Sequence, residues 1–279
     1  MRSLATTEPR AVPRVVAIST TAVKGLALEA PQSVHVGPAG VATDRAFFLV
    51  DADGVMINGK ALGELVRVRA TVADDLSELT LRFPDATEVR GSVVLGAPRI
   101  VQFFRARFAA PSVLGPWADA LSDFCGCPIA LCRAPAERPG VDRGLRGAVS
   151  LVSAGALEAL RQAGNVPEPI DPRRFRMLFL IDGVAPHAED HWCGRTVGVG
   201  DARLRINGLV GRCAVTTRDP DSGRVDLPTL HYLTLYRGDI RADERLPFGV
   251  YAEVAASGTV RVGDPIEPAG GDPERLERG

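Results

Sequence analysis

The chain has 279 residues, of which 46% are hydrophobic and 24% charged, and its formal net charge is -1. Proteins that bind nucleic acids usually carry a basic patch and a high pI, so the balance of 33 basic and 34 acidic side chains argues against that class. No stretch approaches the roughly 20 apolar residues of a membrane-spanning helix. The odd number of cysteines, 5, excludes complete disulfide pairing within one chain.

The two ends of the chain predict a cytoplasmic protein with no membrane association. Residues 1–13 are polar, contain proline and lack the apolar core of a secretory signal peptide. Reduced thiols are the expectation in that compartment. Residues 269–279 are rich in glycine, proline and charge, which predicts a disordered tail.

The first half of the chain predicts short strands joined by turns. The turn Asp51-Ala52-Asp53-Gly54 between two apolar runs is typical of a hairpin. A helix is expected at 116–124, because its apolar residues recur at helical spacing. Strands are expected at 12–18, 33–36, 45–51, 55–57, 79–83, 88–95 and 129–132.

The second half follows a polar Pro/Gly/Arg stretch, residues 133–146, which predicts a loop. Ser153 is the expected N-cap of a helix that ends near Gly164. Strands are expected at 149–152, 177–181, 203–206, 214–217, 250–254 and around Ile266. The sum predicts an α+β chain, mostly antiparallel β with barrel-like closure, divided into domains at 12–130 and 131–268.

Cys213 is the first candidate functional residue. It follows Arg212 at the edge of an apolar run, where positive charge would stabilise a thiolate. A buried cysteine that acts as a small hydrophobic residue is the alternative. The segment 219–223 superficially resembles a calcium loop, but Leu230 stands where that loop needs glutamate, so a hairpin turn is the better interpretation.

Two further groups contain metal-ligating residue types. His187 and His191 have the spacing to bind zinc together with Cys193 if the segment is helical. Pro186 favours a loop instead, with Glu189 and Asp190 as structural carboxylates. The cysteines at 125, 127 and 132 lack a second matching pair, which favours structural or free thiols.

Six short motifs in a fixed order resemble MOSC proteins, over roughly residues 15–267. The motif Arg212-Cys213 to Gly223 and the segment 233–237 resemble the C-terminal signature of that domain, and 247–251 with 258–265 resemble its closing strands. The remaining matches are Arg174-Phe175-Arg176, 188–192, Ala22-Val23-Lys24-Gly25 and Thr43-Asp44-Arg45-Ala46-Phe47. The last two are similar to the N-terminal β-barrel domain that precedes MOSC in amidoxime-reducing-type proteins.

The resemblance implies a β-barrel-like first domain, a MOSC β-barrel second domain and a molybdenum cofactor (molybdopterin). In that family a thiolate ligates the metal, and Cys213 occupies the corresponding position, which makes it both the metal ligand and the catalytic candidate. Lys24, Arg45, Arg176 and Arg212 match positions that hold the anionic cofactor. Arginine suits bidentate phosphate contact, and Lys24 is one of only two lysines in the chain.

The chain departs from the family pattern at four places. Gly25 replaces a common serine, Met177-Leu178 replaces a Pro-Asn pair, and Gly211 stands where relatives can offer a hydroxyl. Polar residues expected before the strand at 149 are replaced by Arg146-Gly147-Ala148. Several side-chain donors to the cofactor are therefore replaced, and a relative that keeps the fold but has changed its ligand is an alternative.

Three functions follow from the resemblance. The first is an oxidoreductase that reduces small N-hydroxylated compounds with electrons from a separate donor such as a ferredoxin or flavoprotein reductase, because the chain has no ferredoxin-like cysteine set and no Rossmann fingerprint. The second is a molybdenum-independent thiol or sulfur-handling enzyme, with Cys213 as nucleophile or persulfide carrier. The third is a non-enzymatic barrel that binds a small molecule at a vestigial site.

Overall fold

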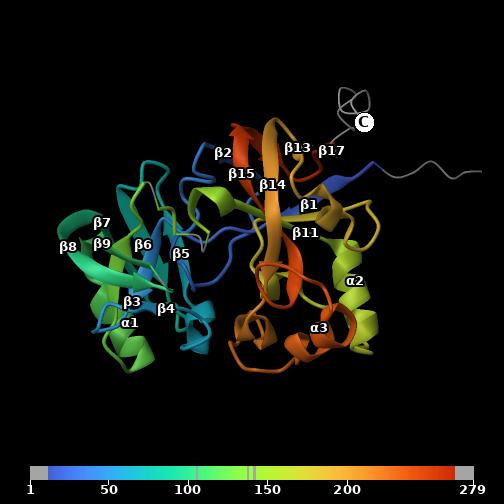
Figure 1. The fold of residues 1–279 in the computed structure, drawn as a ribbon. Coiled ribbons are helices and arrows are strands. Elements are labelled where there is room, and N and C mark those ends of the chain that lie inside the picture. Colours follow the sequence, from blue (N-terminus) through green and yellow to red (C-terminus); the bar gives the residue numbers. More distant parts are fainter. Residues whose placement is uncertain (1–11, 105, 137, 141–142, 268–279) are drawn as a thin grey trace, which may run out of the picture.

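The computed structural model describes residues 12–104, 106–136, 138–140 and 143–267. The predicted tail at 269–279 lies outside these residues. Two halves built mainly of strands lie side by side, as Figure 1 shows, with the second half carrying two of the helices. In the described residues no helix is long and apolar enough to cross a membrane.

A seven-stranded sheet forms the second half. Its neighbouring strands are, in order, β1 (Arg14–Ile18), β12 (Phe179–Asp182), β11 (Val149–Ser153), β15 (Pro247–Ala256), β14 (Ala202–Gly211), β13 (Thr196–Val199) and β17 (Ile266–Glu267). The backbone N–H of Val15 donates to the carbonyl of Asp264 (2.9 Å), and that of Ile266 donates to the carbonyl of Pro13 (2.8 Å). The start of β1 is therefore hydrogen-bonded to the start of β17 and the residues just before it. These bonds join the two sheet edges and nearly close a barrel.

The first strand of the chain thus lies in the second half, where Figure 1 shows it in blue. β2 (Ser33–Val36) also pairs there, with β16 (Gly258–Arg261). The two halves are therefore joined by strand pairing as well as by the chain between them. The bounds 12–130 and 131–268 stay a prediction.

Two smaller sheets form the first half. One has the strand order β4 (Met56–Ile57), β3 (Phe47–Val50), β10 (Ala130–Arg133), β9 (Ala106–Leu114) and β8 (Val94–Phe103), and the other has β5 (Arg69–Val72), β6 (Glu78–Arg82) and β7 (Glu88–Ser92). The helix α1 (Trp117–Cys125) packs into their core through the fully buried Trp117 and Leu121. The indole N–H of Trp117 donates to the carbonyl of Leu79 (3.1 Å), so the buried ring is also satisfied as a donor.

The α+β prediction with mostly antiparallel strands and a barrel-like closure is confirmed. β3 and β4 form the hairpin predicted around residues 51–54, and β6 and β7, which overlap the strands expected at 79–83 and 88–95, form another. β11 and β12 are the one parallel pair among the paired strands of the described residues. The helix α2 (Ala154–Ala163) begins as predicted after Ser153, whose hydroxyl accepts the N–H of Ala156 (3.1 Å).

The prediction of a strand at 214–217 is wrong. Residues Ala214–Thr217 form a 3₁₀ turn after the end of β14. Thr216 folds back so that its N–H (3.2 Å) and its hydroxyl (3.1 Å) both donate to the carbonyl of Cys213. Its hydroxyl also lies 2.6 Å from that of Thr229, the first residue of the helix α3 (Thr229–Arg237), which the sequence did not predict. Local hydroxyl-to-backbone bonds outweigh the β-propensity of Val and Thr here.

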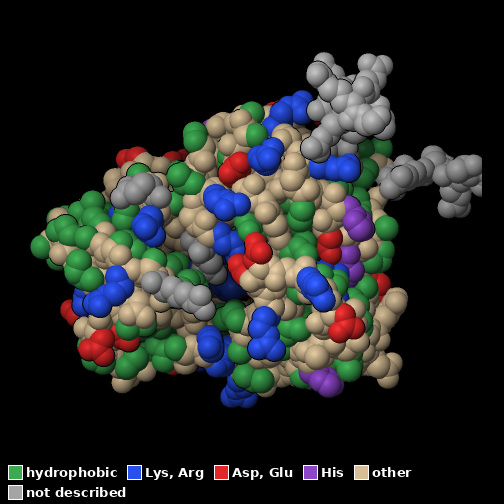
Figure 2. Space-filling model, viewed as in Figure 1, with side chains coloured by type: hydrophobic (Ala, Val, Ile, Leu, Met, Phe, Trp, Pro, Cys, Tyr) green, Lys and Arg blue, Asp and Glu red, His purple; other side chains and the backbone are tan. Residues whose placement is uncertain are grey.

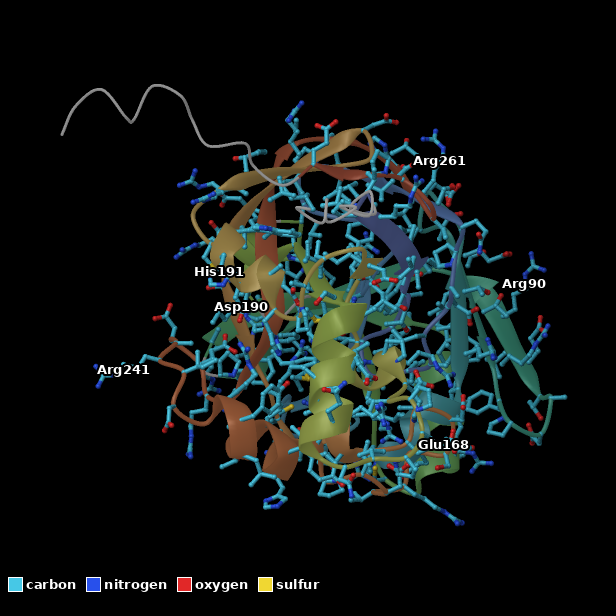
Figure 3. All side chains as sticks on the ribbon, turned by 90° about the vertical axis from the view of Figure 1, so that its right-hand side faces the viewer. Arg90, Glu168, Asp190, His191, Arg241 and Arg261 are labelled. Atoms are coloured by element: carbon cyan, nitrogen blue, oxygen red, sulfur yellow. The ribbon has the colours of Figure 1, made fainter. Side chains whose placement is uncertain are left out.

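The segment 187–193 holds α2 and α3 in place. The buried Glu189 accepts from the N–H (2.9 Å) and the hydroxyl (3.1 Å) of Ser153, at the start of α2. Asp190 pairs with the buried Arg237 of α3 (2.6 Å). Figure 3 shows Asp190 and His191 on the side of the view opposite to Arg90. The carboxylates of this segment thus have the structural contacts that one interpretation of the sequence expected.

His187 makes the stability of this region depend on pH. Burial and the nearby Arg237 lower the pKa of His187 from its ordinary 6.5 to about 4, and its Nε2 lies 3.3 Å from the Tyr236 hydroxyl. The folded state disfavours the charged imidazole, so the stabilisation is present above pH 6.5 and is lost as the pH falls towards 4. We expect the unfolding free energy of the unmodified protein to fall relative to that of His187→Gln over this range, as measured by urea titration. A difference that stays constant with pH would contradict this.

Candidate functional site

A cavity of about 230 Å³ opens between the two halves. It is far larger than the roughly 30 Å³ that one water occupies, so it can hold a small organic molecule. Seven cationic side chains line it, against the single carboxylate of Asp44 among its described lining residues: Lys24, Arg45, Lys60, Arg143, Arg174, Arg176 and Arg212. Figure 2 shows Lys and Arg side chains bordering the hollow between the halves. The cavity therefore favours an anionic ligand.

Arg45 is one of the two buried cations of the cavity, with Arg174. Its side chain is 9% exposed and pairs with Asp44, whose own side chain is 5% exposed. The other oxygen of Asp44 accepts the N–H of Thr21 (2.8 Å), and Arg45 donates through Nη2 to the backbone carbonyl of Arg176 (2.8 Å). Arg45 comes from the first half and Arg176 from the second, so this bond joins the two walls of the cavity.

Arg45 and Arg176 share an uncommon backbone conformation. Both have φ at +52°, in the left-handed region that residues other than glycine rarely adopt. The guanidinium of Arg176 donates to the carbonyl of Leu26 (2.7 Å), which ties it back to the first half. Strained backbone that is held by several contacts is often found at functional sites.

Lys24 lies on the wall formed by the first half. Its backbone N–H donates to Phe47 (2.8 Å), which anchors the loop after β1 to β3. Its ammonium lies 5.4 Å from the ring centroid of Phe103, the last residue of β8. The lysine thus connects the cavity to the β8–β9 hairpin.

Arg212 lines the cavity, and its guanidinium is bound to the second half. Nε donates to the carbonyl of Phe248 (2.9 Å), Nη1 donates to that of Phe175 (3.0 Å), and Nη2 lies 2.8 Å from the sulfur of Met177. These contacts fix the chain immediately before Cys213. Arg212 therefore positions the cysteine as well as contributing charge.

Cys213 lies at the point where β14 ends on the cavity wall. The residue is exposed, and its backbone is extended with φ −126° and ψ 176°. Its carbonyl accepts both bonds from Thr216, so the 3₁₀ turn holds the residue in place. The structure thus brings Cys213 into one cavity with Lys24, Arg45, Arg176 and Arg212, as a shared site requires.

The other cysteines differ from Cys213 in their surroundings. Burial raises the pKa of Cys125 to about 12 and that of Cys132 to about 11, and it raises that of the exposed Cys193. Thiolates react and thiols do not, so a raised pKa slows alkylation. We expect iodoacetamide at pH 8 to label Cys213 at least about tenfold faster than Cys125 and Cys132, measured by peptide mass spectrometry. Equal rates would contradict this.

The sequence did not single out three further cations of the cavity. Lys60 follows β4, Arg174 pairs through both nitrogens with Asp226 (2.7 and 2.6 Å), and Arg143 pairs with Glu244. Arg174 lies two residues before Arg176, which matches a cofactor-holding position of the family, and this closeness in sequence could have placed Arg174 near the cavity. Lys60 and Arg143 had none, because the fold alone brings their segments to the cavity.

Two of the departures from the family pattern have local structural reasons. Gly25 has φ +97°, where a side chain is strained. A Cβ at Gly211 would lie 2.3 Å from the Cβ of Glu244, whose carboxylate accepts the Gly211 N–H (3.0 Å). Both positions therefore need glycine in this fold.

The departure at Met177-Leu178 places apolar atoms in the cavity wall. Leu178 is 2% exposed and belongs to the barrel core, and Met177 offers its sulfur to Arg212. Both line the cavity as well. This part of the cavity wall therefore offers apolar contact to a ligand where a polar side chain would offer a hydrogen-bond donor.

The expected zinc alternative at 187–193 has no ligand set in the structure. The segment around Glu189 forms a 3₁₀ turn, with His187 in the left-handed region at φ +59°. Across the described parts of the chain, no group of three or more His, Cys, Asp or Glu residues could hold a metal ion. The carboxylates of this segment contact Ser153 and Arg237 instead.

Comparison with known proteins relates both halves to described domains. Residues 12–126 match the MOSC N-terminal beta barrel domain and residues 139–267 match the MOSC domain. The chain is 25% identical to the mitochondrial amidoxime-reducing component 1 of Mus musculus, over 87% of this chain and 77% of that protein. It is 25% identical to the molybdenum cofactor sulfurase of Anopheles gambiae, over 79% of this chain but 31% of that protein.

Among solved structures, the YUAD protein from Bacillus subtilis aligns with 93% of this chain and 96% of its own, at 11% identity and a TM-score of 0.45. The two domain matches cover most of the chain in the order that the sequence motifs indicated. The chain belongs to the MOSC family, with a MOSC N-terminal beta barrel domain followed by a MOSC domain.

Proposed function

We propose that the protein is a molybdenum-cofactor-dependent oxidoreductase that reduces small N-hydroxylated compounds. The observation that carries the proposal is the meeting of Cys213 with seven cations in one cavity between the two domains. The similarity to an amidoxime-reducing component over most of the chain gives the reaction class. The similarity to a cofactor sulfurase points to the same cofactor.

The residues present fit an anionic group that needs a sulfur ligand. Cys213 is exposed on the cavity wall, and thiolate sulfur suits a soft metal centre. The surrounding arginines and lysines offer charge and planar donor sets for a phosphate. Cys213 would ligate the metal, while Lys24, Arg45 and Arg176 would hold the anionic part and Arg212 would fix the ligand loop.

The reaction takes up two electrons and two protons. The N–O bond of the substrate breaks, the nitrogen keeps its other substituents and gains a hydrogen, and the oxygen leaves as water. The bound cofactor supplies the redox-active metal for this chemistry. The electrons come from a separate donor protein, such as a ferredoxin or a flavoprotein reductase. The chain itself binds and orients the small substrate in the basic cavity.

The test is reduction of benzamidoxime by the purified protein with reduced methyl viologen as the electron source. We expect amidine formation in protein produced with molybdate and none when tungstate replaces molybdate in the medium. Equal rates from both preparations would contradict the proposal, because the reaction would then not depend on molybdenum.

The alternative is a sulfur-handling enzyme in which Cys213 carries a persulfide. The exposure of Cys213 and the match to a sulfurase favour this reading. The chain spans 31% of the length of that sulfurase. Intact-mass detection of one added sulfur on the unmodified protein but not on Cys213→Ser, without molybdenum, would support the alternative.

A further inference from the structure

The β8–β9 hairpin exposes apolar side chains on its outer face. Ile100 is 59% exposed and Phe104, just after β8, is 52% exposed. Between them, Val101 and Phe103 are buried in a cluster with Phe48, so the strand alternates between core and solvent. In Figure 2 hydrophobic side chains cover much of the end of the molecule where Figure 1 places β8 and β9. Such a patch marks an interaction surface.

The charge of this hairpin has one sign. From residue 94 to residue 114 the sequence contains three arginines and no aspartate or glutamate. Arg107 is exposed and lies opposite Gln102 in the register, next to the pair Ile100 and Ala109, which puts Arg107 and Ile100 on the same face. Gln102, between Ile100 and Phe104 on this face, is exposed as well, so none of the described elements covers the face.

The hairpin also reaches the cavity. Phe104 is one of the residues that line it, and the neighbouring Phe103 contacts the ammonium of Lys24. The exposed Lys60 lies on the same rim. A protein bound to the outer face of the hairpin would therefore lie next to the opening of the cavity.

We infer that this outer face, Ile100, Phe104 and Arg107 with the rim lysine Lys60, is the docking site of an acidic electron-donor protein. The inference rests on the proposed function, which requires electrons from a separate protein. Apolar contact at the centre and arginine around it complement a donor whose redox centre is surrounded by carboxylates. A protein is favoured over an anionic membrane because the face ends at the cavity, where the electrons are used.

The test compares two electron sources on one variant. In Ile100→Ser/Arg107→Glu, neither residue lines the cavity, so turnover with reduced methyl viologen should be unchanged. With a reduced acidic [2Fe–2S] ferredoxin as the probe, we expect the KM for ferredoxin to rise at least about tenfold. Added salt should raise this KM for the unmodified protein more than for the variant.

Arg203→Glu is the matched control. Arg203 is exposed near the start of β14, and Gly211, next to the cavity, ends the same strand, about 26 Å away at roughly 3.3 Å per residue. The same charge reversal there should leave the KM unchanged. An equal KM in the hairpin variant and the unmodified protein would overturn the docking site.

Two further measurements separate the possible failures. The affinity for ferredoxin, measured calorimetrically, should be lower in the hairpin variant than in the unmodified protein. This binding measurement tests the docking site even if neither electron source supports turnover. Absent turnover with viologen contradicts the proposed function, whereas unchanged ferredoxin binding contradicts the docking site. The unmodified protein could instead sediment with phosphatidylglycerol vesicles while the hairpin variant does not. If ferredoxin binding were unchanged in that variant, the face would be assigned to a membrane and the inference overturned.

Discussion

Cys213→Ser is expected to lower viologen-driven turnover at least about 100-fold. Loss of a residue that merely orients a metal ligand already costs about 10- to 100-fold, so loss of the ligand itself should cost more. The exposed position of Cys213 makes the change in stability small, within about 0.5 kcal/mol, so the melting temperature should stay the same. The measurement is kcat with benzamidoxime together with a thermal melt.

Cys193→Ser is the control for this prediction. Cys193 is the other exposed cysteine of the described chain, and it lies outside the cavity lining. Its replacement should leave turnover unchanged. If Cys213→Ser retained full turnover and its metal, Cys213 would not be the ligand, and the account of the site would be wrong.

Asp44→Ala is expected to destabilise the protein by about 3–5 kcal/mol. The change leaves the guanidinium of Arg45 without its carboxylate at a position that is 9% exposed, and an uncompensated buried charge has this cost. The Thr21 N–H loses its acceptor in the same step. Urea unfolding followed by circular dichroism measures the effect.

Two comparisons sharpen the Asp44 prediction. Glu88→Ala removes the partner of Arg82 in a pair whose side chains are 64% and 40% exposed, and it should cost less than about 1 kcal/mol. The double change Asp44→Leu/Arg45→Met removes both charges and should recover much of the stability, while cofactor content falls. Equal losses of unfolding free energy for Asp44→Ala and Glu88→Ala would show that burial does not raise the cost of removing one partner of the ion pair.

Local sequence signals predicted the elements that depend on local chemistry. The turn at 51–54 fixed a hairpin because Gly54, with φ +79°, supplies the conformation that the turn needs. Ser153 was identified as an N-cap from its place between a strand and an apolar helical run, and its hydroxyl does cap α2. Such signals need only a few neighbouring residues.

Elements that depend on distant contacts were not predictable in the same way. Nothing in the pattern of β1 indicates that it pairs with β12, some 160 residues later. The long hairpin of β8 and β9 was missed because Gly96, Pro98 and Pro111 interrupt its pattern. α3 was missed because its apolar residues do not gather on one face: Leu233 is buried and Leu235 is 61% exposed.

The candidate site was predicted from the motif resemblance rather than from spacing. Residues from 24 to 213 in the chain meet in one cavity, and only the fold brings them together. The resemblance identified Lys24, Arg45, Arg176 and Cys213 but could not show that Asp44 neutralises Arg45 or that Arg212 is held by backbone carbonyls. Those roles depend on atomic contacts that no motif encodes.

The molybdenum and pterin content of the purified protein tests the central claim most directly. The protein is produced in a host supplied with molybdate, the metal is measured by mass spectrometry, and the pterin by fluorescence after oxidation. The account predicts both in stoichiometric amounts in the unmodified protein, with molybdenum strongly reduced in Cys213→Ser. Trace molybdenum that is the same in both proteins, with no pterin fluorescence, would contradict it.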